Sequence, residues 1–391
     1  MDLNIPEDLK MAQTMARDFV KNQLIPIERQ VLGRDSDLVG ARQTLTPETE
    51  EKLVKLVQDM GLWGLSLPEA LGGVGLGVLG TCLVEEELAK TIIPFNFGDV
   101  TPVLFDCNEQ QKAEYLLPVI NRQKNACLAL IEPGKGIDPG SLEMKAGKIS
   151  GKYILNGKKI AFAKKKADFF IVFAVTNPEK SVREGVTCFL VDINTPGFSV
   201  IRNEEKTGWQ AQVAEPVTLV FENCEVNPEK VLGEEGKAFN LGKKWLPTRR
   251  IVRSARCVGA AVRLLDVCVE YAKSWRSFGK GISDWPSIQA ALSDIAIDIH
   301  AARLMVFDAA WKADEGQDIR QEAAMVKVFT TEMLKRVANR TVQVKGGPAL
   351  ARELPLEVLC QNMLKQNIGE QALEVQRSII TGDILKLAVI I

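Results

Sequence analysis

The spacing of hydrophobic residues divides the chain into a helical first third, a β-rich middle and a helical final part. One apolar face in the first third repeats every three or four residues and comprises Leu53, Leu56, Val57 and Met60. That spacing indicates an amphipathic helix. Thr46 and Pro47 stand where a helix cap and a first helical residue are expected, and Gly61 follows the last apolar position. The pattern therefore predicts a helix between Thr46 and Gly61.

From about Lys124 the pattern changes to short alternating or β-rich stretches, which Gly, Asn and Pro separate. The clearest of these stretches are ISGKYILNGKKIAF, ADFFIVFAVT, VTCFLVDI and EPVTLVFENCEV. They predict a small antiparallel β domain that ends near Gly233. After Gly236 the chain is again helical, in long segments with few breaks, which favours an antiparallel four-helix bundle.

The expected fold class is therefore α+β, in three parts. We predict an N-terminal helical domain over 1–123, a middle antiparallel β domain over 124–236 and a C-terminal four-helix bundle over 237–391. A chain of 391 residues is long enough for two or three such units. Its 46% hydrophobic and 25% charged residues are ordinary for a soluble globular protein. A net charge of −1 gives no electrostatic reason to expect nucleic acid or an anionic membrane as a partner.

Cysteine and histidine usage predicts a protein without a metal site. The eight cysteines are scattered without a C-x-x-C pair, and His300 is the single histidine. This argues against zinc and against a disulfide framework, and it fits a reducing cytoplasm. The polar start MDLNIPEDLK resembles neither a secretory signal nor a transit peptide, and no apolar run approaches a membrane span. We therefore expect a cytoplasmic location.

Two loops carry recognisable motifs. The segment Cys127–Gly140 reads CLALIEPGKGIDPG, and the segment Gly61–Gly77 reads GLWGLSLPEALGGVGLG. The first resembles the loop A-L-T-E-P-x-x-G-S-D of the acyl-CoA dehydrogenase family, and the second resembles that family's G-x-x-G-L-x-x-P-E-x-x-G-G-x-G. By itself a glycine-rich loop such as the second favours only a tight turn between helices. The two hydroxyl positions of the first loop, which in the family reach the flavin and the thioester, are Ile131 and Ile137 here.

The resemblance extends over essentially the whole chain and implies the same order of helices, β domain and bundle. It also implies an acyl-CoA thioester as substrate and FAD as cofactor. The family's reaction removes the α-proton with a carboxylate and passes the β-hydride to flavin, which is α,β-desaturation. An electron acceptor protein is implied only if FAD is bound. A homo-oligomer, or a hetero-oligomer with a related subunit, is the implied assembly.

The resemblance supplies a candidate base and candidate substrate contacts. The family's E-G-T-x-x-I-Q-R aligns with residues 370–377, which places Glu370 at the base position. Gly369 replaces the usual aromatic neighbour, so the surroundings that set the pKa of this base differ from those in the family. Arg250 matches a family arginine at the substrate end of the site, with a solvated surface charge as the alternative. Gly136 and Ile137 complete the expected substrate contacts.

The positions expected to contact FAD follow the family pattern only in part. Leu130, Phe278, Gln289, Gln343, Gly346 and Gly347 keep the family's residues, whereas Ile131, Ala163 and Arg276 depart from it. The family's W-I-T or W-I-S is Ala161-Phe162-Ala163, and Ala372 replaces the threonine of E-G-T. Trp275 stands where the R-x-x-F-G motif has its arginine, and Arg276 is one place off, about 100° around a helix axis. The following run Lys164–Lys166 favours a solvated loop over a phosphate contact.

Several functional interpretations stay open on the sequence alone. Desaturation by an assembly is the leading one, with this chain either an ordinary FAD-dependent dehydrogenase or a flavin-poor subunit whose partner supplies the complete site. The next is a flavin-free acyl-CoA hydratase, lyase, isomerase or hydrolase that uses Glu370, because enolate formation needs a base and oxyanion donors but no redox cofactor. A non-catalytic subunit that binds a CoA ester or serves a structural role is the remaining alternative.

Overall fold

The computed structural model describes residues 5–28, 45–93, 95–135, 139–163, 167–202, 215–350, 356, 359 and 372–386. The chain forms two compact units, which we treat separately. The helical unit comprises Met1–Asp37, Gln43–Phe97 and Leu246–Ile391, and the β unit comprises Leu38–Arg42 and Gly98–Trp245. The expected boundaries of the three-domain division at 123 and 236 stay a prediction.

The helical unit contains the long helices. They are α1 (Glu7–Phe19), α3 (Pro47–Asp59), α4 (Gly77–Leu88), α8 (Leu246–Ser274), α9 (Pro286–Asp314), α10 (Arg320–Lys345) and α12 (Leu373–Leu385). The predicted helix after Thr46 is confirmed as α3, and the Thr46 hydroxyl accepts the N–H of Thr49 at 3.2 Å. Shorter helical turns are η1 (Val20–Leu24), η2 (Ile25–Ile27), η3 (Glu69–Leu71), η10 (Ile282–Asp284) and η11 (Gly347–Leu350).

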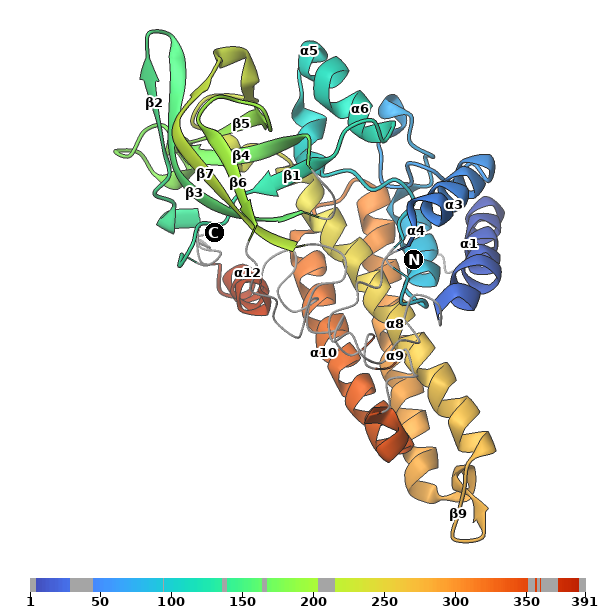
Figure 1. The fold of residues 1–391 in the computed structure, drawn as a ribbon. Helices are drawn as coiled ribbons and strands as arrows, with labels where there is room; N and C mark the ends of the chain where they lie inside the picture. The colour runs from blue at the N-terminus through green and yellow to red at the C-terminus, as the bar shows by residue number, and fades with distance from the viewer. Residues whose placement is uncertain are drawn as a thin grey trace. The chain divides into compact units, whose positions relative to one another are not determined.

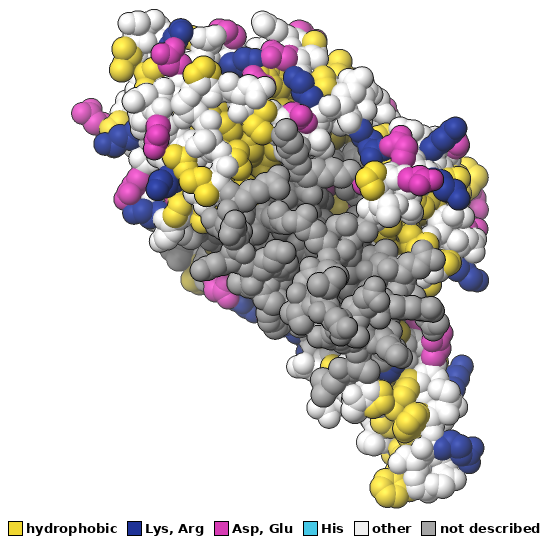
Figure 2. All heavy atoms as spheres, viewed as in Figure 1, with side chains coloured by type: hydrophobic (Ala, Val, Ile, Leu, Met, Phe, Trp, Pro, Cys, Tyr) yellow, Lys and Arg dark blue, Asp and Glu magenta, His cyan; other side chains and the backbone are white. Residues whose placement is uncertain are grey.

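The predicted bundle is confirmed by α8, α9 and α10, which run alongside one another (Figure 1). Their facing sides bury Leu264, Cys268, Ile295, Val306 and Met333, and α12 packs against α10. At one end of the bundle, the short strands β9 (Arg276–Ser277) and β10 (Lys280–Gly281) form a hairpin between α8 and α9. Figure 2 shows hydrophobic side chains on the surface at this end.

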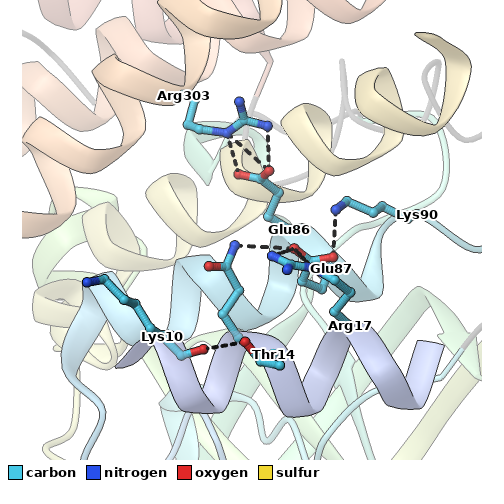
Figure 3. A network of polar contacts seen from close by, with 8 residues as sticks. Lys10, Thr14, Arg17, Glu86, Glu87, Lys90 and Arg303 are labelled. Carbon is cyan, nitrogen blue, oxygen red and sulfur yellow. Dashed lines mark hydrogen bonds and ion pairs between the residues drawn. The ribbon is translucent and has the colours of Figure 1, made fainter. Parts of the chain in front are cut away.

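Helix α4 is the polar centre of the helical unit. It buries three consecutive glutamates, each of which faces a cation from a different place in the unit. Glu85 pairs with Arg256 of α8. Figure 3 shows the other pairs, Glu86 with Arg303 of α9, and Glu87 with Arg17 of α1 and with Lys90. A Cβ on Gly259 of α8 would lie 2.0 Å from the Glu86 carbonyl oxygen, so the close approach of α8 to α4 requires glycine there. Ion pairs and backbone contact together fix α4 among its neighbours.

The β unit is built on one sheet with strand order β6-β7-β3-β2-β4-β5-β8, and β1 pairs with β4. Its strands are β1 (Ala126–Ala129), β2 (Lys145–Ile149), β3 (Lys152–Ala163), β4 (Phe169–Val175), β5 (Val186–Asp192), β6 (Phe198–Arg202), β7 (Glu215–Val226) and β8 (Val231–Leu232). Short helices in the unit are η4 (Pro102–Asp106), α5 (Glu109–Gln111), η5 (Lys112–Leu116), α6 (Leu117–Ile120), η6 (Pro139–Ser141), α7 (Val182–Gly185), η7 (Pro228–Lys230), η8 (Ala238–Asn240) and η9 (Lys243–Trp245).

The sheet is mixed rather than wholly antiparallel. Most neighbours pair antiparallel, as predicted, but β4 runs parallel to both β1 and β2. The reason is the connection, because the β2–β3 hairpin intervenes between β1 and β4 in the chain and lets β4 re-enter in the direction of β1. The last strand ends at Leu232, next to Gly233, where the sequence predicted the β segments to stop. The sheet places the end of β1 beside β3, which is where the candidate site begins.

Candidate functional site

The recognisable loop follows β1 and lies against β3. The N–H of Ile160 in β3 donates to the Ile131 carbonyl at 2.8 Å, and these two residues form an isolated antiparallel bridge. Ala163 is the last residue of β3 and pairs with Glu215 of β7. The structure therefore brings the segment of Leu130 and Ile131 alongside the end of β3 that carries Ala163, two stretches that the sequence expected to serve one ligand.

A buried ion pair holds this segment in place. The Lys159 ammonium, fully buried, donates to Glu132 Oε1 at 2.7 Å and to the Leu130 carbonyl at 3.1 Å. The Glu132 carboxylate, only 6% exposed, also accepts the backbone N–H groups of Glu143 at 2.9 Å and Met144 at 3.0 Å. Lys159 and Glu132 thus tie β3, the segment after β1 and the approach to β2 together.

The electrostatics of the pair keep Glu132 ionised. Burial raises the pKa of Glu132, but the hydrogen bonds from Lys159 and from the two backbone N–H groups outweigh it, so the net pKa is lowered. Burial lowers the pKa of Lys159, and the bond to Glu132 opposes that shift. Three hydrogen-bond donors at Glu132 stabilise its ionised form relative to its protonated form. The pair is therefore a charged anchor in an otherwise hydrophobic interior.

Lys159 is a residue that reasoning from sequence missed. Inward positions of β3 alternate with outward ones, and Tyr153, Leu155 and Ala161 are buried on the same face as Lys159. Its neighbour Lys158 is exposed. The signal that could have found Lys159 is a lysine at an inward position of an alternating strand, because such a charge requires a partner.

In the helical unit, the candidate substrate residue Arg250 lies near the start of α8. It is 4% exposed, so the alternative of a solvated surface charge does not hold. The Ser254 hydroxyl donates to the Arg250 carbonyl at 2.8 Å, one helical turn further on. The structure therefore places a buried guanidinium in the first turns of α8.

The hairpin at the other end of α8 carries the altered R-x-x-F-G motif. Trp275 stacks on Tyr271 with ring centroids 5.3 Å apart, and the Arg276 guanidinium turns back to donate to the Gly279 carbonyl at 3.3 Å. Phe278 is 92% exposed and has a φ of 48°, next to Gly279 with a φ of 83°. Two positive φ values in a two-residue hairpin loop define a tight turn in which glycine or asparagine is the usual first residue. The tip of the hairpin is therefore an exposed aromatic surface. Position 275, where the motif has an arginine, is a tryptophan.

The remaining candidate cofactor residues are at this same end of the bundle. Gln289, in the first turn of α9, is exposed and donates to the Ser283 carbonyl at 2.9 Å. Gln343 is exposed near the end of α10, and Gly346 and Gly347 follow it, also exposed. The Lys345 ammonium lies 5.1 Å from the centre of the Tyr271 ring, which joins the end of α10 to the end of α8.

The structure does not bring Arg250 together with the hairpin. Arg250 and Ser274 lie on the same straight helix, roughly 36 Å apart at about 1.5 Å per residue. Arg276 and Phe278 follow Ser274 in the hairpin. One copy of the helical unit therefore presents its two sets of candidate residues at opposite ends of α8.

Other predicted positions lie outside the described residues: Gly136, Ile137, Glu370 and the run Lys164–Lys166. Ala372 is described, and it is the N-cap residue of α12 with φ −63° and ψ 155°, without a side-chain cap. Within the described ranges no group of three or more His, Cys, Asp or Glu is placed to hold a metal ion. In the same ranges, none of the helices combines the length and the hydrophobicity needed to cross a membrane.

Comparison with known proteins gives this architecture a family. Three sequence models match in order: the N-terminal domain of acyl-CoA dehydrogenase over residues 6–123, its middle domain over 127–224 and its C-terminal domain over 239–385. The (R)-benzylsuccinyl-CoA dehydrogenase of Thauera aromatica is 34% identical over 399 residues, which cover 98% of this chain and 97% of that protein.

Solved structures agree in fold. Butyryl-CoA dehydrogenase from Megasphaera elsdenii superposes with a TM-score of 0.84 at 30% identity, covering 98% of this chain and all of that one. The FAD complex of PigA superposes with a TM-score of 0.85 at 28% identity, covering 99% of this chain and all of that one. The chain belongs to the acyl-CoA dehydrogenase family, and its fold class is the α+β architecture of that family. Members of the family are oxidoreductases.

Proposed function

We propose that this chain binds an acyl-CoA thioester within an acyl-CoA dehydrogenase assembly that performs α,β-desaturation, and that the chain by itself holds FAD weakly or not at all. The observation that carries this proposal concerns the loop after β1. The groups that hold its backbone are present, but side chains expected to contact a ligand are replaced. Lys159 and Glu132 hold the backbone of the segment after β1. Ile131 in that segment offers no hydroxyl to a ligand.

Several of the expected flavin contacts do not fit FAD as the family holds it. Ile131, Ala163 and Ala372 carry alkyl groups where the family has hydroxyls, and a buried acceptor left unpaired costs roughly 1–3 kcal/mol. Trp275 replaces the arginine, and the neighbouring Arg276 guanidinium is bonded within its own hairpin. We therefore assign no flavin chemistry to this chain.

The thioester side of the proposal uses Arg250, which is a buried cation, and Gly136, which keeps the family's residue. Ile137 stands at the other expected substrate contact without the family's hydroxyl. Glu370 stands at the position of the base and in this proposal removes the α-proton of the bound thioester. The β-hydride of the same thioester would then pass to a flavin that a second subunit holds beside it.

The separation along α8 supports an oligomer. Because Arg250 and the hairpin are roughly 36 Å apart, a ligand at one end of α8 in one copy does not reach the other end. A second chain, identical or related, is needed to bring a hairpin to the ligand site. We expect a dimer of dimers or a tetramer in light scattering at micromolar concentration, and a monomer mass would contradict this part of the proposal.

The absorbance spectrum of freshly purified protein tests the flavin statement directly. We expect little or no flavin absorbance after extensive dialysis of the lone chain, and one tightly held FAD per subunit would refute it. Half occupancy with a co-purified relative supports the partner-subunit interpretation. A colourless protein that turns over an acyl-CoA by itself supports the flavin-free enzyme instead. Ile131→Thr combined with Ala163→Ser is expected to raise flavin occupancy, with Ile131→Val as the control that adds no hydroxyl.

A further inference from the structure

Lys159 is a charged residue in a row of hydrophobic ones. It is fully buried on β3, on the face that also buries Tyr153, Leu155 and Ala161. An ammonium group withdrawn from water is costly unless its charge and its donors are matched, and an apolar pair of similar volume is often at least as stable. Stability alone therefore does not account for a lysine at this position.

The hydrogen bonds of an ion pair have a defined direction, which contacts between apolar side chains lack. The Lys159 ammonium holds the Leu130 carbonyl, and the N–H of Ile160 holds the next carbonyl, that of Ile131. The Glu132 carboxylate is held in turn by Lys159 and by the backbone N–H groups of Glu143 and Met144. Three successive residues are thus each fixed by a hydrogen bond of defined direction, which hydrophobic contacts would not provide.

We propose that Lys159 is a positioning residue for the ligand site: through the Leu130 carbonyl and the Glu132 carboxylate it sets the backbone of residues 130–132, which leads to the loop positions expected to contact the acyl-CoA thioester. This inference rests on the proposed function. It adds that the binding of the ligand depends on a buried lysine of β3 that acts through the backbone of this segment. It also explains why the frame of this loop is kept when two of its hydroxyl positions are apolar, because Lys159 and Glu132 act on the backbone and not on those side chains.

The test separates positioning from stability with a double variant. Lys159→Met with Glu132→Met removes both charges and replaces them by side chains of similar length. We expect its urea midpoint to stay close to that of the unaltered chain, because no buried charge is left unpaired. We expect its dissociation constant for butyryl-CoA, measured by isothermal titration calorimetry, to rise about tenfold as the hydrogen bond to the Leu130 carbonyl is lost. Lys158→Met, on the exposed face of the same strand, is the matched control and should leave both quantities unchanged.

Each outcome decides the inference. A double variant with unaltered stability and unaltered affinity would show that the pair is only structural. If the double variant does not fold, Glu132→Gln is measured in its place, because one amide oxygen cannot replace both carboxylate oxygens that accept from Lys159 and from the N–H groups of Glu143 and Met144. A loss of affinity above about threefold at an unaltered urea midpoint then supports positioning, and unaltered affinity overturns it. If the unaltered chain binds no butyryl-CoA or other CoA thioester, the proposed function fails first, and this inference falls with it.

Discussion

The ion pair between Glu86 and Arg303 offers a sharp test of how the helical unit is held together. Glu86 of α4 is 3% exposed, and the Arg303 guanidinium of α9 contacts both of its oxygens, with the shortest distance 2.7 Å (Figure 3). Arg303→Met removes the cation and keeps a side chain that fills space. The carboxylate of Glu86 is then left buried without its partner.

The expected loss follows from that burial. Breaking a buried pair by removing one partner typically costs about 3–5 kcal/mol, because an uncompensated charge is left behind. For a chain of 391 residues that unfolds as a whole, this corresponds to a fall in melting temperature of about 4–6 °C. The double change Arg303→Met with Glu86→Met removes both charges and is expected to recover most of the loss.

The assay is urea unfolding followed by circular dichroism and by tryptophan fluorescence, whose midpoints must coincide before a single free energy is extracted. Lys10→Met is the control, because Lys10 pairs with Glu7 of α1 on the surface, where such pairs contribute about 0–1 kcal/mol. The reasoning is refuted if Arg303→Met costs no more than Lys10→Met. It is also refuted if the double variant is as unstable as the single one.

Three further predictions concern other parts of the molecule. Ala372→Ser supplies the missing cap of α12 and is expected to raise the free energy of unfolding by about 0.5–2 kcal/mol in urea, whereas Ala372→Val, which has no acceptor, should not. Burial raises the pKa of Asp298 in α9, but hydrogen bonds from two arginines of α10 outweigh it and lower the pKa in the folded chain. Ionised Asp298 therefore stabilises the fold fully above its pKa in the unfolded chain, and this stabilisation is lost as the pH falls through its lower pKa in the folded chain. Asp298→Asn should make the free energy of unfolding fall less steeply between about pH 5 and 2. An unchanged slope would contradict this. Glu370→Gln is expected to slow exchange of the α-protons of a bound acyl-CoA with deuterated water by about 10²–10⁴-fold, while Glu374→Gln, at an exposed position on α12, should leave exchange intact. Equal rates in both variants would remove Glu370 as the base.

Local patterns in the sequence predicted the elements well where their causes are local. The helix after Thr46 begins with the expected cap, and the β segments between Lys124 and Gly233 form strands as expected, although their sheet is mixed rather than wholly antiparallel. The loop after β1 was identified from its motif, and the structure places its first residues beside β3. These features depend on residues that are neighbours in the chain.

Features that depend on distant residues were not predictable in the same way. Three consecutive glutamates on α4 are all buried, because cations from α1, α8 and α9 surround the helix, and these cations lie far from α4 in the sequence. The partner of Glu132 in the loop is Lys159, which the motif itself does not identify. The burial of Arg250 excludes a solvated surface charge, and its place in the substrate site stays a prediction.

The turn at the tip of the bundle has a consequence for handling the protein. Phe278 adopts a positive φ that a bulky residue tolerates poorly, and its ring is almost wholly exposed to water. An asparagine at that position would suit the turn better and would remove an adhesive aromatic group. A lone chain kept at high concentration is therefore expected to self-associate through this tip, and Phe278→Asn is the substitution we would choose to keep it in solution during purification.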